Sequence, residues 1–216
     1  DIALPGNVFK SIDGGASWQR LDVSPGNPVT RVALHPDDPQ RVYALGYGGV
    51  FSSDDGGGHW SKLDETFKSA VYTFFYDHVF APDDPETMYV GTYAGGIIKS
   101  IDGGRNWFEI NGLRHDGDVL ANSYGIALDP TDSDTLYATT IGGVFKTNDG
   151  GETWGFIGEG VFQHLREMTL DPTAPDRLYL GGDSRTFYTS DDGGDSWNQI
   201  PLDQVALGDD PQFPIM

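Results

Sequence analysis

The sequence predicts an all-β protein built as a β-propeller, and three observations carry this prediction. The motif S/T-x-D-x-G-x-x-W occurs five times, and each of the five tryptophans closes one copy. The copies start 42, 47, 47 and 43 residues apart, a period typical of propellers and solenoids. Short apolar runs separated by Gly- and Pro-rich turns lie between the copies, as expected for four-stranded antiparallel blades.

The motif, which we call the box, has the chemistry of a tight turn between two strands. The five boxes are residues 11–18, 53–60, 100–107, 147–154 and 190–197. The Asp accepts hydrogen bonds from turn amides, the glycines supply positive φ values, and the Trp begins the return strand and packs into the core. The predicted structural residues are therefore Asp13, Trp18, Asp55, Trp60, Asp102, Trp107, Asp149, Trp154, Asp192 and Trp197.

Four strands, A to D, can be placed in each repeat. In the repeat that holds the second box, strand A is the apolar run Val32–Leu34, before a Pro-rich turn, and strand B contains Tyr43. Strand C contains Val50 and Phe51 and runs into the box, and strand D follows Trp60. The strand B tyrosine recurs in a fixed column, namely Tyr43, Tyr89, Tyr137 and Tyr179.

The two ends of the chain complement each other. Residues 1–30 supply a partial strand B (Ile2–Leu4), then strands C and D with the first box, and Val205–Pro211 repeats strand A and its turn. We therefore expect one domain, 1–216, with five blades, one of them completed by both termini, so that no sheet edge is exposed. The alternative is a window from a longer array, since Phe213–Met216 also aligns with strand B.

Composition limits the possible partners. The chain has 33 acidic and 13 basic residues and a net charge of −20, which argues against nucleic acid or an anionic membrane surface. Box turns explain much of the acidity, and adaptation to salt is the alternative. There is no cysteine and no apolar run of 18 residues, so we predict neither disulfides nor a membrane span.

The five boxes resemble the Asp-box (BNR) repeat of sialidases, xyloglucanases, sortilin-type receptors and photosystem II assembly factors. The resemblance covers nearly the whole chain and implies a propeller. It implies no single activity, because functions in this family diverge. It also implies export. Since the chain begins at Asp1 without a signal-like segment, we interpret it as a mature or trimmed extracellular or cell-surface product.

The family's ligands usually bind the face opposite the boxes, where the D–A and B–C connections lie. Long loops on a rigid scaffold often carry function, and the two longest D–A segments follow Trp60 and Trp107. Of only eight arginines, four map to this face. We predict a ligand-binding site that selects an anionic group, although chance placement would give the same distribution. The candidate residues are Arg31, Arg114, His115, Arg166 and Arg185.

Other candidate residues allow two interpretations each. The aromatic run Tyr72–Tyr76 is either a lengthened core strand or a sugar-stacking platform. Asp116 and Asp118 are either a general acid and base or a chance pair in an Asp-rich chain. The box aspartates lack the bidentate Glu of a calcium loop and already serve the turn. We therefore predict no metal and no cofactor.

The favoured function is a non-catalytic propeller that binds a protein or polysaccharide. The alternatives are a glycoside hydrolase and a fragment of a larger array. Sialidases carry an F/Y-R-I-P signature near the N-terminus, whereas the nearest string here, Phe213–Ile215, lacks Arg and lies at the other end. A xyloglucanase-like enzyme needs two larger propellers with a cleft between them. Both enzyme interpretations are therefore weaker than binding.

Overall fold

A computed structural model of the chain contains strands and no helix among the residues that it describes. Those residues are 8–23, 28–46, 49–63, 75–93, 95–110, 112–115, 118–119, 122–161, 165–182 and 186–201. The all-β prediction is confirmed.

Four antiparallel sheets, I to IV, have four strands each, paired in chain order. Sheet I contains β3 (Val29–Leu34), β4 (Val42–Gly46), β5 (Gly49–Ser53) and β6 (Ser61–Lys62). Sheet II contains β7 (Phe75–Phe80), β8 (Met88–Thr92), β9 (Gly96–Ser100) and β10 (Phe108–Glu109). Sheet III contains β13 (Ser123–Asp129), β14 (Asp132–Thr140), β15 (Gly143–Thr147) and β16 (Gly155–Phe156). Sheet IV contains β17 (Leu165–Asp171), β18 (Ala174–Gly182), β19 (Thr186–Ser190) and β20 (Asn198–Pro201).

Two hairpins stand outside these sheets. One pairs β1 (Val8–Lys10) with β2 (Gln19–Leu21) and carries the first box, as expected for strands C and D. The other pairs β11 (Arg114–His115) with β12 (Asp118–Val119). The second hairpin lies in the long segment after Trp107 that the sequence had suggested was a loop.

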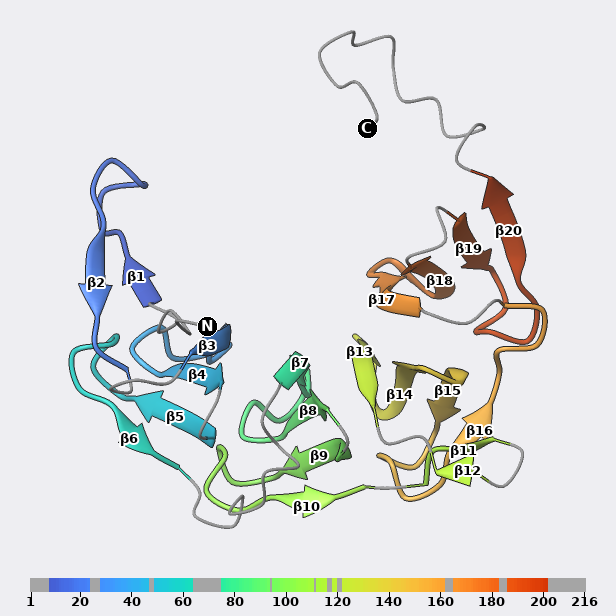
Figure 1. Cartoon of the computed structure of the whole chain (residues 1–216), viewed down its shortest axis with the longest axis horizontal. Helices are drawn as coiled ribbons and strands as arrows, with labels where there is room; N and C mark the ends of the chain where they lie inside the picture. The colour runs from blue at the N-terminus through green and yellow to red at the C-terminus, as the bar shows by residue number, and fades with distance from the viewer. Residues whose placement is uncertain are drawn as a thin grey trace, which may run out of the picture.

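The sheets stand side by side around a common centre (Figure 1). The first strands, β3, β7, β13 and β17, lie innermost, and the last strands lie outermost. The described strands form an arc, with an opening between the β1–β2 hairpin and sheet IV. Residues 2–4 and 205–211, which were expected to complete the fifth blade, lie outside the described residues.

The boxes have the predicted turn geometry. The fourth and fifth residues of every box are glycines, and all ten of these have positive φ, between 66° and 96°. In every box the Asp Oδ1 accepts the backbone N–H of the seventh residue at 2.8–2.9 Å. Its Oδ2 accepts the side chain of that same residue at 2.5–2.6 Å. The seventh residues are Ser17, His59, Asn106, Thr153 and Ser196. Each supplies a donor that the sequence interpretation had overlooked.

The core lies between neighbouring sheets. Each of four apolar clusters joins two successive units, and each includes the half-buried box Trp of the later unit. These are Trp60, Trp107, Trp154 and Trp197. The prediction that every Trp packs into the core fails for Trp18, which is 64% exposed. Its hairpin is the first described unit, so no earlier described sheet covers it.

Every innermost strand begins with a β-bulge. In sheet I, Val29 pairs with Gly46 and Arg31 with Leu45, so Thr30 has no residue opposite it. The same shift occurs at Tyr76, Tyr124 and Arg166 in β7, β13 and β17. An extra residue in one strand re-aims its side chain. The bulges therefore set four side chains in one register at the inner edge.

Candidate binding site

The bulged ends of the inner strands lie on the face opposite the boxes. Each box joins the third and fourth strands, and its first Gly donates to the turn after the first strand, as in the bond from Gly56 N to Gln40 O at 2.7 Å. The start of the first strand is therefore at the far end of each sheet. This is where the sequence placed the ligand face.

Three tyrosines and one arginine form a continuous row on this face. The rings of Tyr76 and Tyr124 lie 4.9 Å apart at an angle of 62°. Tyr93, in the turn after β8, lies 6.4 Å from Tyr76. On the other side, the guanidinium carbon of Arg166 lies 5.4 Å from the centre of the Tyr124 ring. We call these four residues the tyrosine row. It crosses sheets II, III and IV.

The tyrosine row combines apolar and cationic surface at the protein exterior. Tyr93 is 44% exposed, Arg166 is exposed, and Tyr76 and Tyr124 are half-buried. An arginine over a tyrosine face forms a cation–π contact. The row therefore places aromatic ring surface and one positive charge side by side.

The strands beneath the row are tied to each other through the backbone. The Oδ2 of Asp77 accepts the N–H of Ile126 at 2.9 Å, which joins β7 to β13, and its Oδ1 accepts the N–H of His78 at 2.8 Å. A Cβ added at Gly125 would meet the carbonyl oxygen of Arg166, so β13 and β17 approach closely. The row therefore lies over three inner strands that contact one another directly.

The predicted site residues are only partly brought together. Arg166 belongs to the row, whereas Arg31 follows its bulge on β3 and donates to Thr30 O at 3.4 Å. Arg114 and His115 lie on β11, where the structure describes the backbone alone, and Arg185 lies outside the described residues.

Tyr93 and Tyr124 were not predicted. The run Tyr72–Tyr76 divides at its end, because Phe75 is a core residue, 2% exposed, and Tyr76 joins the row. Residues 72–74 lie outside the described residues. Aligning the repeats on strand A would have placed Tyr76, Tyr124 and Arg166 in one column. That alignment is the signal that was available.

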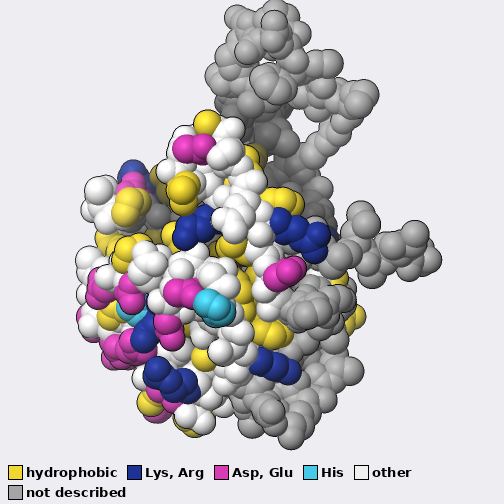
Figure 2. Space-filling model, turned by 90° about the vertical axis from the view of Figure 1, so that its left-hand side faces the viewer, with side chains coloured by type: hydrophobic (Ala, Val, Ile, Leu, Met, Phe, Trp, Pro, Cys, Tyr) yellow, Lys and Arg dark blue, Asp and Glu magenta, His cyan; other side chains and the backbone are white. Residues whose placement is uncertain are grey.

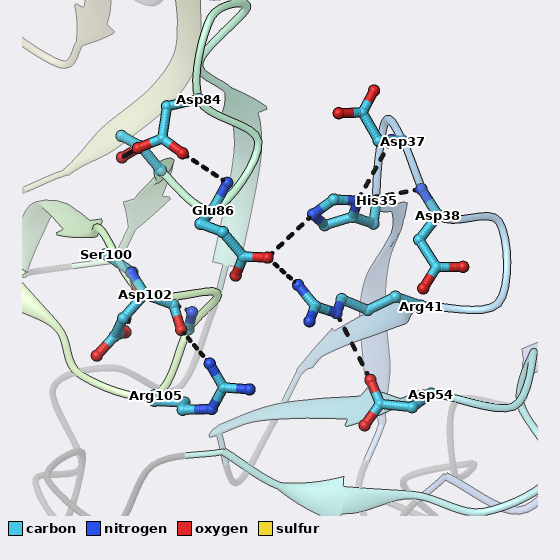
Figure 3. A network of polar contacts seen from close by, with 12 residues as sticks. His35, Asp37, Asp38, Arg41, Asp54, Asp84, Glu86, Ser100, Asp102 and Arg105 are labelled. Atoms are coloured by element: carbon cyan, nitrogen blue, oxygen red, sulfur yellow. Dashed lines mark hydrogen bonds and ion pairs between the residues drawn. The ribbon is translucent and has the colours of Figure 1, made fainter.

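A second polar cluster lies on the box face between sheets I and II (Figure 3). Glu86 Oε1 accepts from Arg41 Nη1 at 2.5 Å and lies 3.6 Å from His35 Nε2. His35 is buried, and its Nδ1 accepts the N–H groups of Asp37 and Asp38 at 3.3 and 3.2 Å. Because Nδ1 is an acceptor, the proton of the neutral ring is on Nε2. The cluster ties the two sheets together and holds its charges in pairs.

The other described arginines also have acceptors outside the row. Arg177 Nε donates to Asp191 at 2.7 Å, and Arg105 Nη1 donates to Asp102 O at 3.0 Å. Arg20 lies 3.9 Å from Asp22. In the repeat, Arg41 and Arg177 precede strand B, Arg105 lies within a box and Arg20 follows one. Their contacts serve the turns and sheet ends.

The box aspartates are electrostatically stabilised as carboxylates. Hydrogen bonds from the seventh and first box residues hold the pKa of Asp13, Asp149 and Asp192 at about 2, and that of Asp55 lower still. Burial raises the pKa of Asp102, but its bonds to Asn106 and Ser100 outweigh burial, so the pKa is lowered. Among the described residues, no group of three or more His, Asp or Glu side chains could hold a metal ion.

Cavities lie beside the inner strands at the box end of the described chain. One, of about 370 Å³, is lined by seven residues: His78, Val79, Phe80, Pro82, Leu128, Asp129 and Pro130. Burial lowers the pKa of His78, and the charge of Arg31 lowers it further. The lining is mainly apolar, and its ionisable residues are His78 and Asp129. We therefore centre the candidate site on the tyrosine row.

The surface charge is mixed despite the acidic composition. On the side that carries the β1–β2 hairpin and sheet I, basic side chains are scattered among acidic ones (Figure 2). No helix in the described part of the chain is long and apolar enough to cross a membrane.

Searches of protein-family models and of curated proteins found no match. Solved structures resemble the chain closely in fold. An ancestral GH74 enzyme matches with a TM-score of 0.73 at 21% identity, over 89% of this chain and 28% of its own. The GH74 xyloglucanase from Xanthomonas campestris gives 0.71 at 20%, over 94% and 35%. YCF48 from Cyanidioschyzon merolae gives 0.64 at 19%, over 92% and 67%.

These similarities define the class of fold. The chain has the fold of a β-propeller, as the repeat predicted. It spans about a third of the length of the GH74 structures. At these levels of identity the likeness extends to the fold alone.

Proposed function

We propose that this protein is a non-catalytic binding or scaffold propeller that uses the face opposite the boxes to hold a protein or polysaccharide partner. The tyrosine row is the observation that carries the proposal. Four bulges in one register direct side chains at the inner edge of that face, and three of these side chains contact one another or Tyr93.

The chemistry of the row favours a partner with flat apolar surface and a carboxylate. Tyrosines offer large, rigid contact area with a polar tip, and a guanidinium pairs well with a carboxylate. On a chain of net charge −20, Arg166 supplies local positive charge. A uronic acid in a polysaccharide or an acidic loop of a protein has both features.

Proteins of similar fold support the binding role. YCF48 has been solved bound to D1 peptide, and that structure matches 91% of this chain with a TM-score of 0.55. A nidogen/laminin complex matches 74% with the same score. By analogy, we infer that the present chain holds its partner without transforming it.

Glycoside hydrolysis is the alternative, because GH74 enzymes share the fold. A hydrolase needs two facing carboxyls, one with a raised pKa. Among the described residues, six carboxyls have a pKa that clearly departs from the usual range, and all six are lowered: five lie in boxes and the sixth is Asp171. On the inner strands, both carboxylate oxygens of Asp77 already accept hydrogen bonds from backbone N–H groups. The described chemistry thus favours binding.

The finer architecture belongs to this proposal. We infer an Asp-box (BNR) propeller of five blades that forms one domain, 1–216, with residues from both termini completing the blade of β1 and β2. We also infer export to the cell surface or beyond. Arg114, His115 and Arg185 would extend the tyrosine row around the same face, and Arg31 would lie beside it, since it follows a bulge and does not occupy one.

The test is a binding screen with a paired substitution. The wild-type chain would be applied to arrays of acidic and neutral polysaccharides and to candidate protein partners at low salt. The variant Tyr124→Ala/Arg166→Ala should lose the hits, because it removes the stacking surface and the cation together. Arg177→Ala is the matched control, since this exposed arginine lies at the box end of sheet IV.

Salt and enzymatic assays complete the test. Binding should weaken as salt rises, because exposed charges are screened over about 10 Å at 0.1 M. Hits that survive the double substitution, or that fall equally with Arg177→Ala, would contradict the proposed face. Release of reducing sugar from a bound polysaccharide would favour hydrolysis instead.

A further inference from the structure

His35 occupies a turn position that two other sheets fill with aspartate. It follows β3 directly, and the corresponding residues are Asp129 in sheet III and Asp171 in sheet IV. In those sheets a carboxylate oxygen accepts the backbone N–H two residues later, at 2.8 and 2.9 Å. In sheet I the same N–H donates to Nδ1 of the His35 ring at 3.3 Å, and the N–H that follows donates to it at 3.2 Å. The imidazole therefore takes the acceptor role that a carboxylate has elsewhere.

These two kinds of acceptor respond differently to acid. A carboxylate keeps its acceptor oxygens down to about pH 4, and hydrogen bonds from Thr173 hold the pKa of Asp171 below its usual range. An imidazole nitrogen accepts only while it carries no proton, and histidine titrates at about pH 6.5. In the protonated ring both nitrogens are donors, so Nδ1 of His35 would face two N–H groups with an N–H of its own.

The ring is oriented for the turn and not for an ion pair with sheet II. It is 7% exposed, and its Nε2 lies 3.6 Å from Glu86 Oε1, where it makes no hydrogen bond. The backbone of Glu86 is held in place, because its N–H donates to Asp84 at 3.2 Å and its carbonyl oxygen accepts from Gly103 at 2.9 Å. The contacts of Nδ1 thus fix the ring.

The charges nearest the ring are already paired. Glu86 Oε1 accepts from Arg41 Nη1 at 2.5 Å, and Arg41 Nε lies 3.5 Å from Asp54. A positive ring would be attracted to Glu86 but would meet the guanidinium of Arg41 at the same oxygen. The carboxylates of Asp37 and Asp38 point away from the ring (Figure 3). The other ionisable groups of the surrounding elements are Asp84, Asp102 and Arg105 in sheet II, together with Tyr43 and His78, whose rings contact Phe80 as His35 does.

We propose that His35 makes the box-end turn of sheet I sensitive to mild acid, because protonation of its ring removes the acceptor for the N–H groups of Asp37 and Asp38. The N–H of His35 donates to Arg41 O at 3.0 Å, so the same turn positions the guanidinium that holds sheet II. Sheet II has Ala81 at the corresponding position. Such a turn therefore forms without the acceptor, and the effect is a loss of stability and not unfolding of the sheet. The turn lies on the box face, opposite the tyrosine row, so this sensitivity is independent of the proposed binding role.

The same substitution at two histidines tests the proposal in the intact chain. His35→Asn supplies a side-chain oxygen that accepts N–H groups at any pH. His59→Asn is the matched control. His59 Nδ1 lies 2.6 Å from Asp55 Oδ2, and Asn106 makes the equivalent bond in its own box at 2.6 Å. A histidine that donates keeps its bond when it is protonated, and the remaining histidines are common to all three chains.

Chemical denaturation at about pH 7.5 and pH 5.5 gives the comparison. The unfolding equilibrium constant of wild type, divided by that of His35→Asn, should rise about three- to tenfold on acidification, since one group that protonates mainly in the unfolded chain contributes up to about tenfold per pH unit. The ratio of wild type to His59→Asn should stay constant or fall. A constant ratio for His35→Asn would show that the turn does not sense the ring, and a falling ratio would show that attraction to Glu86 dominates. Either result overturns the proposal.

Nuclear magnetic resonance adds a readout that does not depend on stability. At about pH 7.5, Nδ1 of His35 should have the nitrogen chemical shift of an unprotonated ring atom. As the ring titrates, the amides of Asp37 and Asp38 should lose protection from hydrogen exchange in wild type and keep it in His35→Asn. A neutral ring that carries its proton on Nδ1 would overturn the proposal.

Discussion

At the scale of the residue, Trp107 has the environment that makes a box tryptophan important. It is half-buried against the cluster between sheets I and II, and its Nε1 donates to Gly104 O at 2.8 Å. Trp107→Ala should lower the free energy of unfolding by about 3–5 kcal/mol, as for other large aromatic deletions. The neighbouring Phe108, 53% exposed, provides the control, and Phe108→Ala should change stability little. Chemical denaturation of both variants gives the answer, and equal losses would place Trp107 outside the core.

The box carboxylates should make stability depend on acid pH. The hydroxyls of Thr147 and Thr153 and the N–H of Thr153 hold the pKa of Asp149 at about 2, against 3.8 for an ordinary Asp. Because the folded-state pKa is depressed, the stabilisation is full above about 4 and is lost as pH falls toward 2. Melting temperatures of wild type and Asp149→Asn should therefore differ at pH 7 and converge between pH 4 and 2.

The exposed acid Asp195 supplies a matched control for the titration. Asp195→Asn removes one negative charge from a box, as Asp149→Asn does. In the box of Asp195, however, the carboxylate that accepts the turn hydrogen bonds is that of Asp192. The melting curve of Asp195→Asn should stay parallel to wild type from pH 7 to pH 2. A constant gap between wild type and Asp149→Asn over that range would show that the turn hydrogen bonds do not depend on the ionised carboxyl.

At the scale of the element, the strands and their order could be predicted from the sequence. The same pattern of apolar runs and turns recurs in every repeat, so an unclear strand in one repeat is identified from the others. The column Tyr43, Tyr89, Tyr137 and Tyr179 lies on the second strand of every sheet, as predicted. The bulges did not follow, because an extra residue in a strand changes no residue type and alters only the pairing. The tyrosine row depends on those bulges, so the repeat alignment puts Tyr76, Tyr124 and Arg166 in one column but does not show that their side chains meet on the surface.

The small number of arginines, four of them mapped to one face, predicted the site residues only in part. Arg31 and Arg166 both lie near the start of inner strands, but a difference of one position in register separates them. Arg166 is the bulged residue and Arg31 follows its bulge. Since side chains alternate along a strand, such a shift decides whether two residues share a surface. Register, more than residue type, determined which predicted residues the structure brings together.

At the scale of the whole molecule, burial changes systematically along the arc. The tyrosine column is at most 1% exposed in sheets I to III and 39% exposed in sheet IV. The box tryptophans are half-buried in sheets I to IV, and the one on the hairpin is 64% exposed. Both departures occur on the faces that border the opening. Each face lacks a described neighbouring sheet, which accounts for the greater exposure.

The last prediction concerns how the chain completes the hairpin blade. If residues 205–211 supply its first strand and turn, deleting Val205–Met216 should leave the hairpin unpaired at an edge, which promotes association or unfolding. Deleting only Phe213–Met216 is the matched control, because strand B of that blade is assigned to Ile2–Leu4 and this tail is surplus to it. Size-exclusion chromatography and thermal melting of both truncations make the comparison. A monomeric longer truncation that melts like wild type would place residues 205–211 outside the propeller, whereas a defect already present in the shorter truncation would assign strand B to the C-terminus.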